Sequence, residues 1–390
     1  MPALSRKMAL AAFALTAVAM LQPLAWRAAG IKPQDLENRP MSSRPKITVD
    51  RLLDSTLYES ISRYLEDRNP LRWYAVVAQA RFRYEVFGTV ENYGSSSQVV
   101  AGRDGWLFIT DSLNQPCWDV EELKRGVSVL RSMQDALSER GKTFVFTVAP
   151  NKASIYPEKL APALVAMSAC ARQSRDGLDG FIRTSGLTHY IDAFDALQSA
   201  RKTEQRPLYV PKETHWTDLG SIYFVSQLMR QVFGETRDLT RLRATGSSSP
   251  TPDLSRLSGL FIPHTLEHYV HDLGGVVTRQ PTTVEHGGEG RPYVRQTSTS
   301  NSVPLDHRKV LILHDSFFYI SWDHLASFFD DVLYVHWNAF DPAKFGEFAR
   351  SADIIIVESV EREVYKRLSE LKPEQAQAFR DALGRADVAR

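Results

Sequence analysis

The chain has 390 residues, of which 43% are hydrophobic and 24% are charged, a composition typical of a folded protein with one large core or two modest ones. Its 47 lysines and arginines balance 46 aspartates and glutamates, and the formal net charge is +1. This balance gives no strong field that would indicate nucleic acid or an anionic membrane surface as a partner. Any partner must therefore be inferred from particular sites.

The N-terminus has the pattern of an export signal. Two cations precede an apolar run at residues 8–21, and continuing the run to Trp26 gives about 19 residues, close to the ~20 that a membrane helix needs. The best small-x-small cleavage site, Ala17-Val-Ala19, lies inside the run, which favours an uncleaved anchor in the inner membrane over a cleaved signal peptide. We expect residues 1–29 to be this signal anchor or signal peptide, residues 30–45 to be a proline-broken linker, and the protein to be periplasmic.

The sequence contains two cysteines, Cys117 and Cys170. In an exported chain, an even pair more often forms a disulfide than a metal site. There is no Cys-x-x-Cys, no His-Glu-x-x-His and no glycine-rich dinucleotide motif, so we expect neither a metal nor a cofactor.

Residues 46–390 have the pattern of an α/β domain with an N-terminal helical brace. Apolar residues at helical spacing over 50–87 are interrupted at Asn69-Pro70, which predicts two helices. Residues 99–108 are typical of a hairpin. Beyond them, helical repeats alternate with short apolar runs, which predicts a three-layer α/β/α sheet. The expected strands are 143–148, 189–194, 208–210, 310–313, 331–337 and 353–360.

Residues 243–306 differ in composition from the segments on either side. They are rich in Gly, Ser and Thr and contain short β-prone segments, so we expect a loop-rich excursion between sheet strands that helps to shape a polysaccharide groove.

The run Val310-Leu-Ile-Leu313 is followed by His314-Asp-Ser-Phe317. A short, branched, apolar run predicts a parallel strand buried on both faces, and ligands of open α/β sheets bind beyond the carboxyl ends of such strands. Ser316 is therefore a candidate nucleophile. The alternative is that Asp315-Ser316 is a helix N-cap that follows the strand.

A serine hydroxyl needs a base, and His215 is the best candidate. It follows a predicted strand, and Glu213 lies two residues before it, where a carboxylate would orient the imidazole. Asn151 and Lys152 follow another predicted strand and are candidates to stabilise an oxyanion, with surface solvation as the alternative for both. Asp315 and the backbone N–H of Ser316 complete the predicted site.

Five motifs carry a family resemblance. They are Gly102-Arg-Asp-Gly-Trp-Leu-Phe108, Val148-Ala-Pro-Asn-Lys-Ala-Ser-Ile-Tyr-Pro157, Glu213-Thr-His-Trp-Thr217, His314-Asp-Ser-Phe317 and Ile355-Ile-Val-Glu-Ser-Val-Glu-Arg362. Their order and spacing resemble the AlgX/AlgJ-type polysaccharide O-acetyltransferases, which are similar to SGNH hydrolases with a permuted order. The resemblance extends over roughly residues 45–370. Glu213 replaces the family's aspartate and His314 replaces its glycine, and a bulky residue beside the serine is expected to crowd the oxyanion site.

The resemblance implies transfer of acetyl groups to hydroxyls of an exported polysaccharide such as alginate, through a Ser316-His215-Glu213 triad and an acetyl-serine. It also implies a membrane-bound O-acyltransferase as the acetyl supplier. Two alternatives stay open: a polysaccharide acetyl esterase, and a non-catalytic glycan-binding scaffold of an exopolysaccharide secretion complex.

Overall fold

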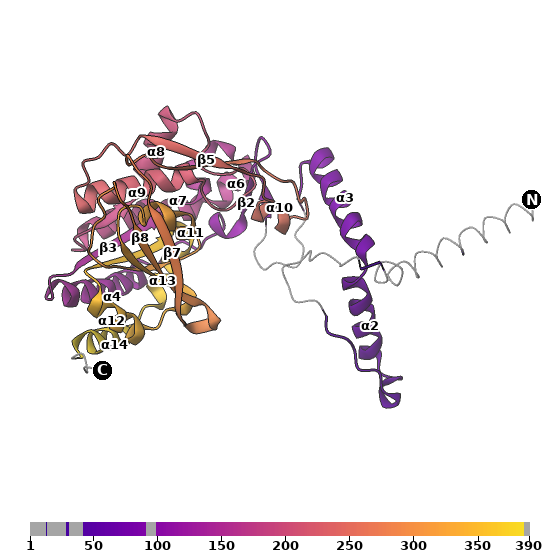
Figure 1. Ribbon diagram of the computed structural model, residues 1–390. Helices are drawn as coiled ribbons and strands as arrows, with labels where there is room; N and C mark the ends of the chain where they lie inside the picture. The colour runs from indigo at the N-terminus through magenta and orange to yellow at the C-terminus, as the bar shows by residue number, and fades with distance from the viewer. Residues whose placement is uncertain (1–12, 14–28, 31–41, 91–98, 386–390) are drawn as a thin grey trace, which may run out of the picture. The chain divides into compact units, whose positions relative to one another are not determined.

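The computed structural model describes residue 13 and residues 29–30, 42–90 and 99–385 (Figure 1). Almost all of the predicted signal anchor or signal peptide and most of the predicted linker fall outside these ranges. Among the residues described, no helix is both long enough and apolar enough to cross a membrane. The chain divides into two compact units, Met1–Ala101 with Asp253–Ile262, and Gly102–Pro252 with Pro263–Arg390.

The smaller unit is largely helical. Its described elements are η1 (Val49–Arg51), α2 (Ser55–Asp67), α3 (Pro70–Phe87), β1 (Val99–Ala101) and α10 (Asp253–Leu257). The break between α2 and α3 falls at Asn69-Pro70, because a proline fits the first position of a helix, where its missing N–H would have no partner within the helix. Arg81 of α3 donates to the carbonyls of Leu260 (2.8 Å) and Phe261 (2.9 Å), which joins α3 to the segment after α10.

The larger unit is organised around a seven-stranded sheet with strand order β4-β3-β11-β9-β10-β8-β7. Strands β4 to β10 in this order are parallel, and β8 and β7 are antiparallel additions at one edge. The strands are β3 (Thr143–Ala149), β4 (Tyr190–Asp192), β7 (Thr278–His286), β8 (Pro292–Thr299), β9 (Val310–His314), β10 (Asp331–His336) and β11 (Ile354–Val360). All five residues of β9 are buried, because β9 lies at the centre of the sheet.

Helices cover both faces of this sheet, as Figure 1 shows. Leu311 and Leu313 of β9 belong to one core cluster with α4, α7, α12, α13 and α14. The sheet residues that alternate with these point to the opposite face, which α9 and α11 cover. Phe318 of α11, for example, contacts Tyr334 of β10. The helices are α4 (Val120–Ser138), α7 (Ala169–Thr184), α8 (Phe194–Thr203), α9 (Asp218–Phe233), α11 (Phe318–Leu325), α12 (Pro342–Ser351), α13 (Glu361–Glu370) and α14 (Pro373–Gly384). This arrangement of layers is the predicted mixed α/β fold.

Shorter elements connect these layers. They are β2 (Leu107–Ile109), η2 (Thr110–Ser112), α5 (Lys152–Ile155), η3 (Pro157–Lys159), α6 (Pro162–Met167), η4 (Gly288–Gly290) and η5 (Trp337–Ala339). The turn before β2 is closed by the Gly102 N–H, which donates to the Trp106 carbonyl (2.8 Å). Asp104 and Gly105 have positive φ there (54° and 75°), a conformation that favours glycine.

The segment 243–306 contains more regular structure than its composition predicts. β5 (Leu242–Ser248) pairs with β6 (Leu266–His271), while β7 and β8 form a hairpin that extends the main sheet through β10. Seven of the nine residues of β7 are exposed, because β7 is an edge strand, and its polar side chains hide the apolar alternation that usually indicates a strand.

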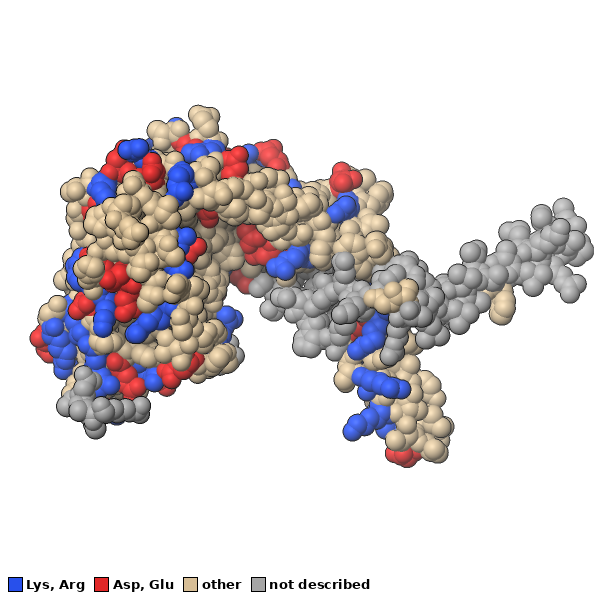
Figure 2. Space-filling view, in the orientation of Figure 1, with Lys and Arg blue, Asp and Glu red and all other residues tan. Residues whose placement is uncertain are grey.

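The surface of the described residues carries charges of both signs. In the view of Figure 2, lysine and arginine side chains alternate with aspartate and glutamate over the larger unit, without a broad patch of one sign on that face. This distribution agrees with the near-zero net charge of the sequence.

Candidate active site

Ser316 lies in the short turn between the end of β9 and the start of α11. The Phe317 N–H donates to Asp315 Oδ1 (2.9 Å), and the Phe318 N–H donates to the Asp315 carbonyl (3.3 Å), so Asp315 closes the turn that precedes the helix. The Asp315 side chain is buried, whereas Ser316 is half-buried. The N-cap of α11 is Phe317, without a side-chain capping hydrogen bond, so the alternative prediction that Asp315-Ser316 is the helix N-cap is wrong. Ser316 presents its hydroxyl at the end of the strand.

His215 joins Ser316 to Glu213. Its Nε2 atom lies 3.0 Å from Ser316 Oγ, and its Nδ1 atom lies 2.9 Å from Glu213 Oε1. The His215 and Glu213 side chains are 22% and 21% exposed, so solvent reaches both. When Nδ1–H donates to the carboxylate, Nε2 carries the lone pair and accepts the serine proton, which is the arrangement that a general base needs.

Trp216 connects the two segments that carry these residues. Its side chain is fully buried, and its indole N–H donates to the Phe317 carbonyl (3.1 Å). The ring of Phe317 in turn packs 5.0 Å from that of His215. Because the only polar group of the buried Trp216 side chain is hydrogen-bonded, Trp216 holds both segments in place without burying an unsatisfied donor.

Lys152 holds the His215 segment from the other side. Its buried ammonium donates to the carbonyls of Val210 (3.3 Å), Pro211 (3.1 Å) and Glu213 (2.6 Å). It also lies 5.1 Å from the centre of the Phe108 ring, within cation–π range. The sequence motifs that contain Phe108, Lys152 and His215 thus meet at the Lys152 ammonium group. The alternative that Lys152 is a solvated surface residue is wrong.

Asn151 is the other residue that we predicted to stabilise an oxyanion. Its side chain is 1% exposed, and its Oδ1 atom accepts a long hydrogen bond from Arg362 (3.4 Å). The Arg362 guanidinium also lies 5.1 Å from the centre of the Phe317 ring, which is adjacent to Ser316. The Asn151 Nδ2 atom is buried without a hydrogen-bond partner among the described residues. A buried, unsatisfied donor of this kind is available for a ligand.

Comparisons with known proteins show what this chain resembles. The model of the "SGNH hydrolase-like domain, acetyltransferase AlgX" family matches residues 99–260. The probable alginate O-acetylase AlgJ of Pseudomonas aeruginosa is 27% identical over 174 residues, which cover 44% of this chain and 41% of the relative. The O-acetyltransferase domain of Pseudomonas putida AlgJ has a similar structure, with a TM-score of 0.50 and 16% identity over 73% of this chain and 99% of that one.

The resemblance to the AlgX/AlgJ-type family is confirmed. Bacillus cereus PatB1 shares the fold as well, with a TM-score of 0.53 and 13% identity over 71% of this chain and all of that one. The match to the P. aeruginosa protein spans about two fifths of that relative's length. The family model ends at residue 260, before β9, so the assignment of Ser316 rests on the geometry of this chain.

His314, where this chain departs from the AlgX/AlgJ-type motif, is accommodated in the core. Its ring is 1% exposed and packs among Phe318, Tyr319, Trp322, Tyr334 and His336. Burial lowers the pKa of His314 to about 3, so the ring is neutral, and its Nδ1 atom lies 2.7 Å from the Asp315 carbonyl. The His314 ring therefore packs against aromatic side chains of α11 and β10, and neither His215 nor Ser316 is among these neighbours.

The last AlgX/AlgJ-type motif supplies carboxyls that we did not assign to the site from the sequence. Glu358 is fully buried and accepts a hydrogen bond from the Asp315 N–H (3.0 Å), while Asp315 Oδ2 accepts from the Val360 N–H (2.7 Å). Burial, reinforced by the nearby Asp315 charge, raises the pKa of Glu358 well above its usual range. Burial raises the pKa of Asp315 as well, although N–H groups of Val360 and Phe317 oppose the shift.

Glu361 is a third buried carboxyl in this region. It accepts hydrogen bonds from the Asn151 N–H (2.8 Å) and the Ser154 hydroxyl (2.8 Å). Burial raises the pKa of Glu361 from 4.5 to about 7. Since Asn151 and Ser154 flank Lys152, this carboxyl positions the loop that carries the candidate oxyanion donor.

Cys117 and Cys170 form a disulfide with their Cα atoms 4.7 Å apart. It ties the segment before α4 to the start of α7, a separation of 53 residues. In the described part of the larger unit, no three His, Cys, Asp or Glu side chains converge closely enough to hold a metal ion.

Proposed function

We propose that this chain is a polysaccharide O-acetyltransferase that uses Ser316 as its nucleophile. The observation that carries the proposal is the chain of hydrogen bonds from Ser316 Oγ through both ring nitrogens of His215 to Glu213. The names of the AlgJ relatives support the choice of alginate, or a similar polymer, as the acceptor. The acetyl supplier would be a membrane-bound O-acyltransferase, and the protein would act in the periplasm from the inner membrane.

The reaction has two half-steps. In the first, Ser316 Oγ attacks the carbonyl carbon of an acetyl donor, its proton moves to His215 Nε2, and the donor's leaving group departs with that proton. In the second, a sugar hydroxyl gives its proton to His215 Nε2 and attacks the acetyl-serine. The ester bond to Ser316 then breaks, and Ser316 Oγ recovers the proton. Glu213 stabilises the imidazolium in both half-steps.

The oxyanion formed in each half-step needs hydrogen-bond donors already in position. The backbone N–H of Ser316 and the Asn151 carboxamide are the two donors that we assign. Loss of one such donor typically costs about 10²–10³ in rate. Asn151→Ala should therefore slow the reaction while leaving the triad hydrogen bonds in place.

The test compares Ser316→Ala, His215→Ala and the double variant on an activated acetyl ester, with exposed Ser138→Ala as a control. Each single variant should lose on the order of 10⁶-fold in rate, and the double variant should be little worse, because residues of one catalytic unit are not additive. Losses that multiply, or full activity of Ser316→Ala, would contradict the triad. Unchanged glycan acetylation in a Ser316→Ala strain would instead favour the scaffold alternative.

A second assay separates the transferase from an acetyl esterase. With the activated ester as donor, oligosaccharide acceptors should become acetylated faster than the ester is hydrolysed. Hydrolysis of an acetylated glycan without any transfer would favour the esterase.

A further inference from the structure

Ser248, His268 and Asp218 form a second serine-histidine-acid arrangement in the larger unit. Ser248 Oγ lies 2.8 Å from His268 Nε2, and His268 Nδ1 lies 3.0 Å from Asp218 Oδ2. These are the same two ring atoms that His215 uses in the candidate active site. When Nδ1–H donates to the carboxylate, Nε2 carries the lone pair and accepts the serine proton. The three side chains therefore have the hydrogen-bond order that activates a serine hydroxyl.

Two paired strands and the start of a helix bring these residues together. Ser248 is the last residue of β5, and its partner in the antiparallel ladder is Leu266 of β6. His268 lies two residues farther along β6, so it is the diagonal neighbour of Ser248 on the same face of the hairpin. Asp218 is the first residue of α9, and its Oδ2 atom also accepts from the Tyr269 N–H (3.2 Å). The carboxylate that contacts the ring thus also joins the hairpin to α9.

Solvent reaches the hydroxyl and the ring, while the carboxyl is more enclosed. Ser248 is exposed, and the His268 and Asp218 side chains are 40% and 20% exposed. Burial opposes the ionised form of Asp218, but hydrogen bonds, chiefly from the His324 and His268 rings, outweigh burial and lower the pKa of this carboxyl. An ionised carboxylate at this position can stabilise the imidazolium that forms when His268 takes a proton.

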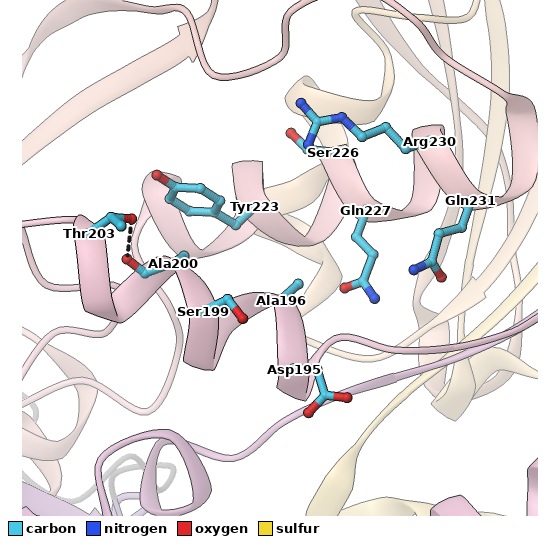
Figure 3. A pocket seen from close by; sticks show the side chains of 10 residues that line it. All are labelled: Asp195, Ala196, Ser199, Ala200, Thr203, Tyr223, Ser226, Gln227, Arg230 and Gln231. Carbon is cyan, nitrogen blue, oxygen red and sulfur yellow. Dashed lines mark hydrogen bonds between the residues drawn. The ribbon is translucent and has the colours of Figure 1, made fainter.

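The groove between α8 and α9, about 670 Å³ in volume, offers a contrast (Figure 3). Hydroxyl groups of Ser199, Thr203 and Ser226 belong to its lining, but none of the ten residues drawn there is a histidine. A hydroxyl without a base is a weak nucleophile at neutral pH. Ser248 differs from these hydroxyls because an imidazole nitrogen lies within hydrogen-bond distance of its Oγ atom.

Ser248 also differs from the serines on either side of it. Successive side chains of a strand point to opposite faces, so Ser247 faces away from the side that carries His268. The Ser249 hydroxyl is hydrogen-bonded to that of Thr265 (3.1 Å). The middle serine of this run is thus the one placed against the imidazole.

We propose that Ser248 is a second nucleophile, which takes an acyl group from an activated ester. Ser248 Oγ attacks the acyl carbonyl carbon and passes its proton to His268 Nε2. The bond from that carbon to the leaving oxygen breaks, the leaving oxygen takes the proton from His268, and the acyl group remains as an ester of Ser248. This step goes beyond the function proposed above and does not depend on Ser316.

The rate of this step should be modest. We assign no oxyanion donor to the Ser248 site, and the loss of one such donor typically costs about 10²–10³ in rate. The acyl ester of Ser248 should therefore form slowly and also hydrolyse slowly, so it is best detected as a covalent product.

The test uses full-chain protein with Ser316→Ala, so that acylation at the candidate active site does not compete. The probes are p-nitrophenyl acetate and an alkyl fluorophosphonate, which forms a stable ester with activated serines. Trypsin releases residues 244–256 as one peptide, which contains all three serines of the run, and tandem mass spectrometry locates the label among them.

We expect both probes to label Ser248 in preference to Ser247 and Ser249. His268→Gln should slow this labelling by about 10²-fold or more, because it removes the base. Exposed Ser247→Ala is the matched control and should leave the labelling of Ser248 unchanged. Asp218→Asn should slow the labelling as well, with a melting curve to show that α9 and the hairpin remain folded.

Equal labelling of the three serines, no label on Ser248, or unchanged labelling in His268→Gln would overturn the proposal. The contacts of Ser248, His268 and Asp218 would then serve only to fasten the β5–β6 hairpin to α9. If Asp218→Asn lowers the melting temperature, the comparison of His268→Gln with the Ser247→Ala control decides.

Discussion

Carboxyl groups occupy two different environments around Ser316. Glu213 is 21% exposed and is hydrogen-bonded to a histidine ring, whereas Glu358 and Glu361 are buried and are bonded to backbone N–H groups. The Glu213 carboxyl contacts the His215 ring and is placed to stabilise a cation that forms there during reaction. The buried acids have raised pKa values and hold loops in place. Replacing glutamate by glutamine should therefore have a different effect on activity and stability at each of Glu213, Glu361 and Glu358.

The largest effect is expected for Glu213→Gln. An amide can hold the wrong imidazole tautomer and cannot stabilise the imidazolium, and the equivalent change in a serine-protease triad costs about 10⁴-fold in rate. Glu213→Asp should be far milder, because it keeps a carboxylate and places there the aspartate that the resemblance to the AlgX/AlgJ-type proteins implies. The measurement is turnover of an activated acetyl ester, with a melting curve for each variant. Near-normal turnover of Glu213→Gln would assign the third member of the triad elsewhere.

An intermediate effect, on stability and not on rate, is expected at Glu361. Its pKa is raised from 4.5 to about 7, so its stabilising contribution is complete below pH 4.5 and is lost as pH rises to 7, because the unfolded chain ionises first. A shift of this size corresponds to roughly 3 kcal/mol. Glu361→Gln has no titrating proton; its amide oxygen can accept from the Asn151 N–H, and its NH₂ group can donate to Ser154 Oγ in place of the bond that Ser154 now donates.

The measurement for Glu361 is the melting temperature from pH 4 to pH 8. The wild-type protein should lose stability relative to Glu361→Gln between pH 4.5 and 7, and the difference should level off above pH 7. Parallel curves for the two proteins across this range would show that Glu361 is already ionised in the folded state.

The sequence predicted the elements whose signal is local. The continuous apolar run of Val310–Leu313 predicted a central buried strand, and the two-residue offset between Glu213 and His215 predicted their contact. The family resemblance brought Ser316 to the same site, which spacing alone does not do, because 101 residues separate it from His215.

The sequence did not predict features that depend on distant partners. β7 was missed because an edge strand with exposed polar residues lacks the apolar alternation of a buried strand. Lys152 was interpreted as a surface or oxyanion group, since nothing nearby in the chain shows that its acceptors lie 58 to 61 residues away. The burial of Glu358 depends on its position inside β11 next to β9, which no local pattern encodes.

The smallest effect is expected for Glu358→Gln, although this residue is the most deeply buried of the three. Glu358 Oε2 accepts the Asp315 N–H (3.0 Å), and Oε1 is buried without a partner among the described residues. Burial and the Asp315 charge raise the pKa of Glu358 well above its usual range, which favours the neutral carboxyl, and a neutral amide of the same shape should therefore replace it with little change. Turnover of Glu358→Gln should stay within a few-fold of wild type. Glu358→Ala should be clearly destabilising, because it leaves the buried Asp315 N–H unpaired, at a cost of about 1–3 kcal/mol, and opens a cavity.

Turnover and melting temperature at pH 7, measured for both Glu358 variants beside Glu213→Gln, rank the effects of these substitutions. A loss of activity in Glu358→Gln comparable to that in Glu213→Gln would mean that Glu358 carries a charge which the reaction uses, and the separation of one reactive acid from the buried structural ones would be wrong.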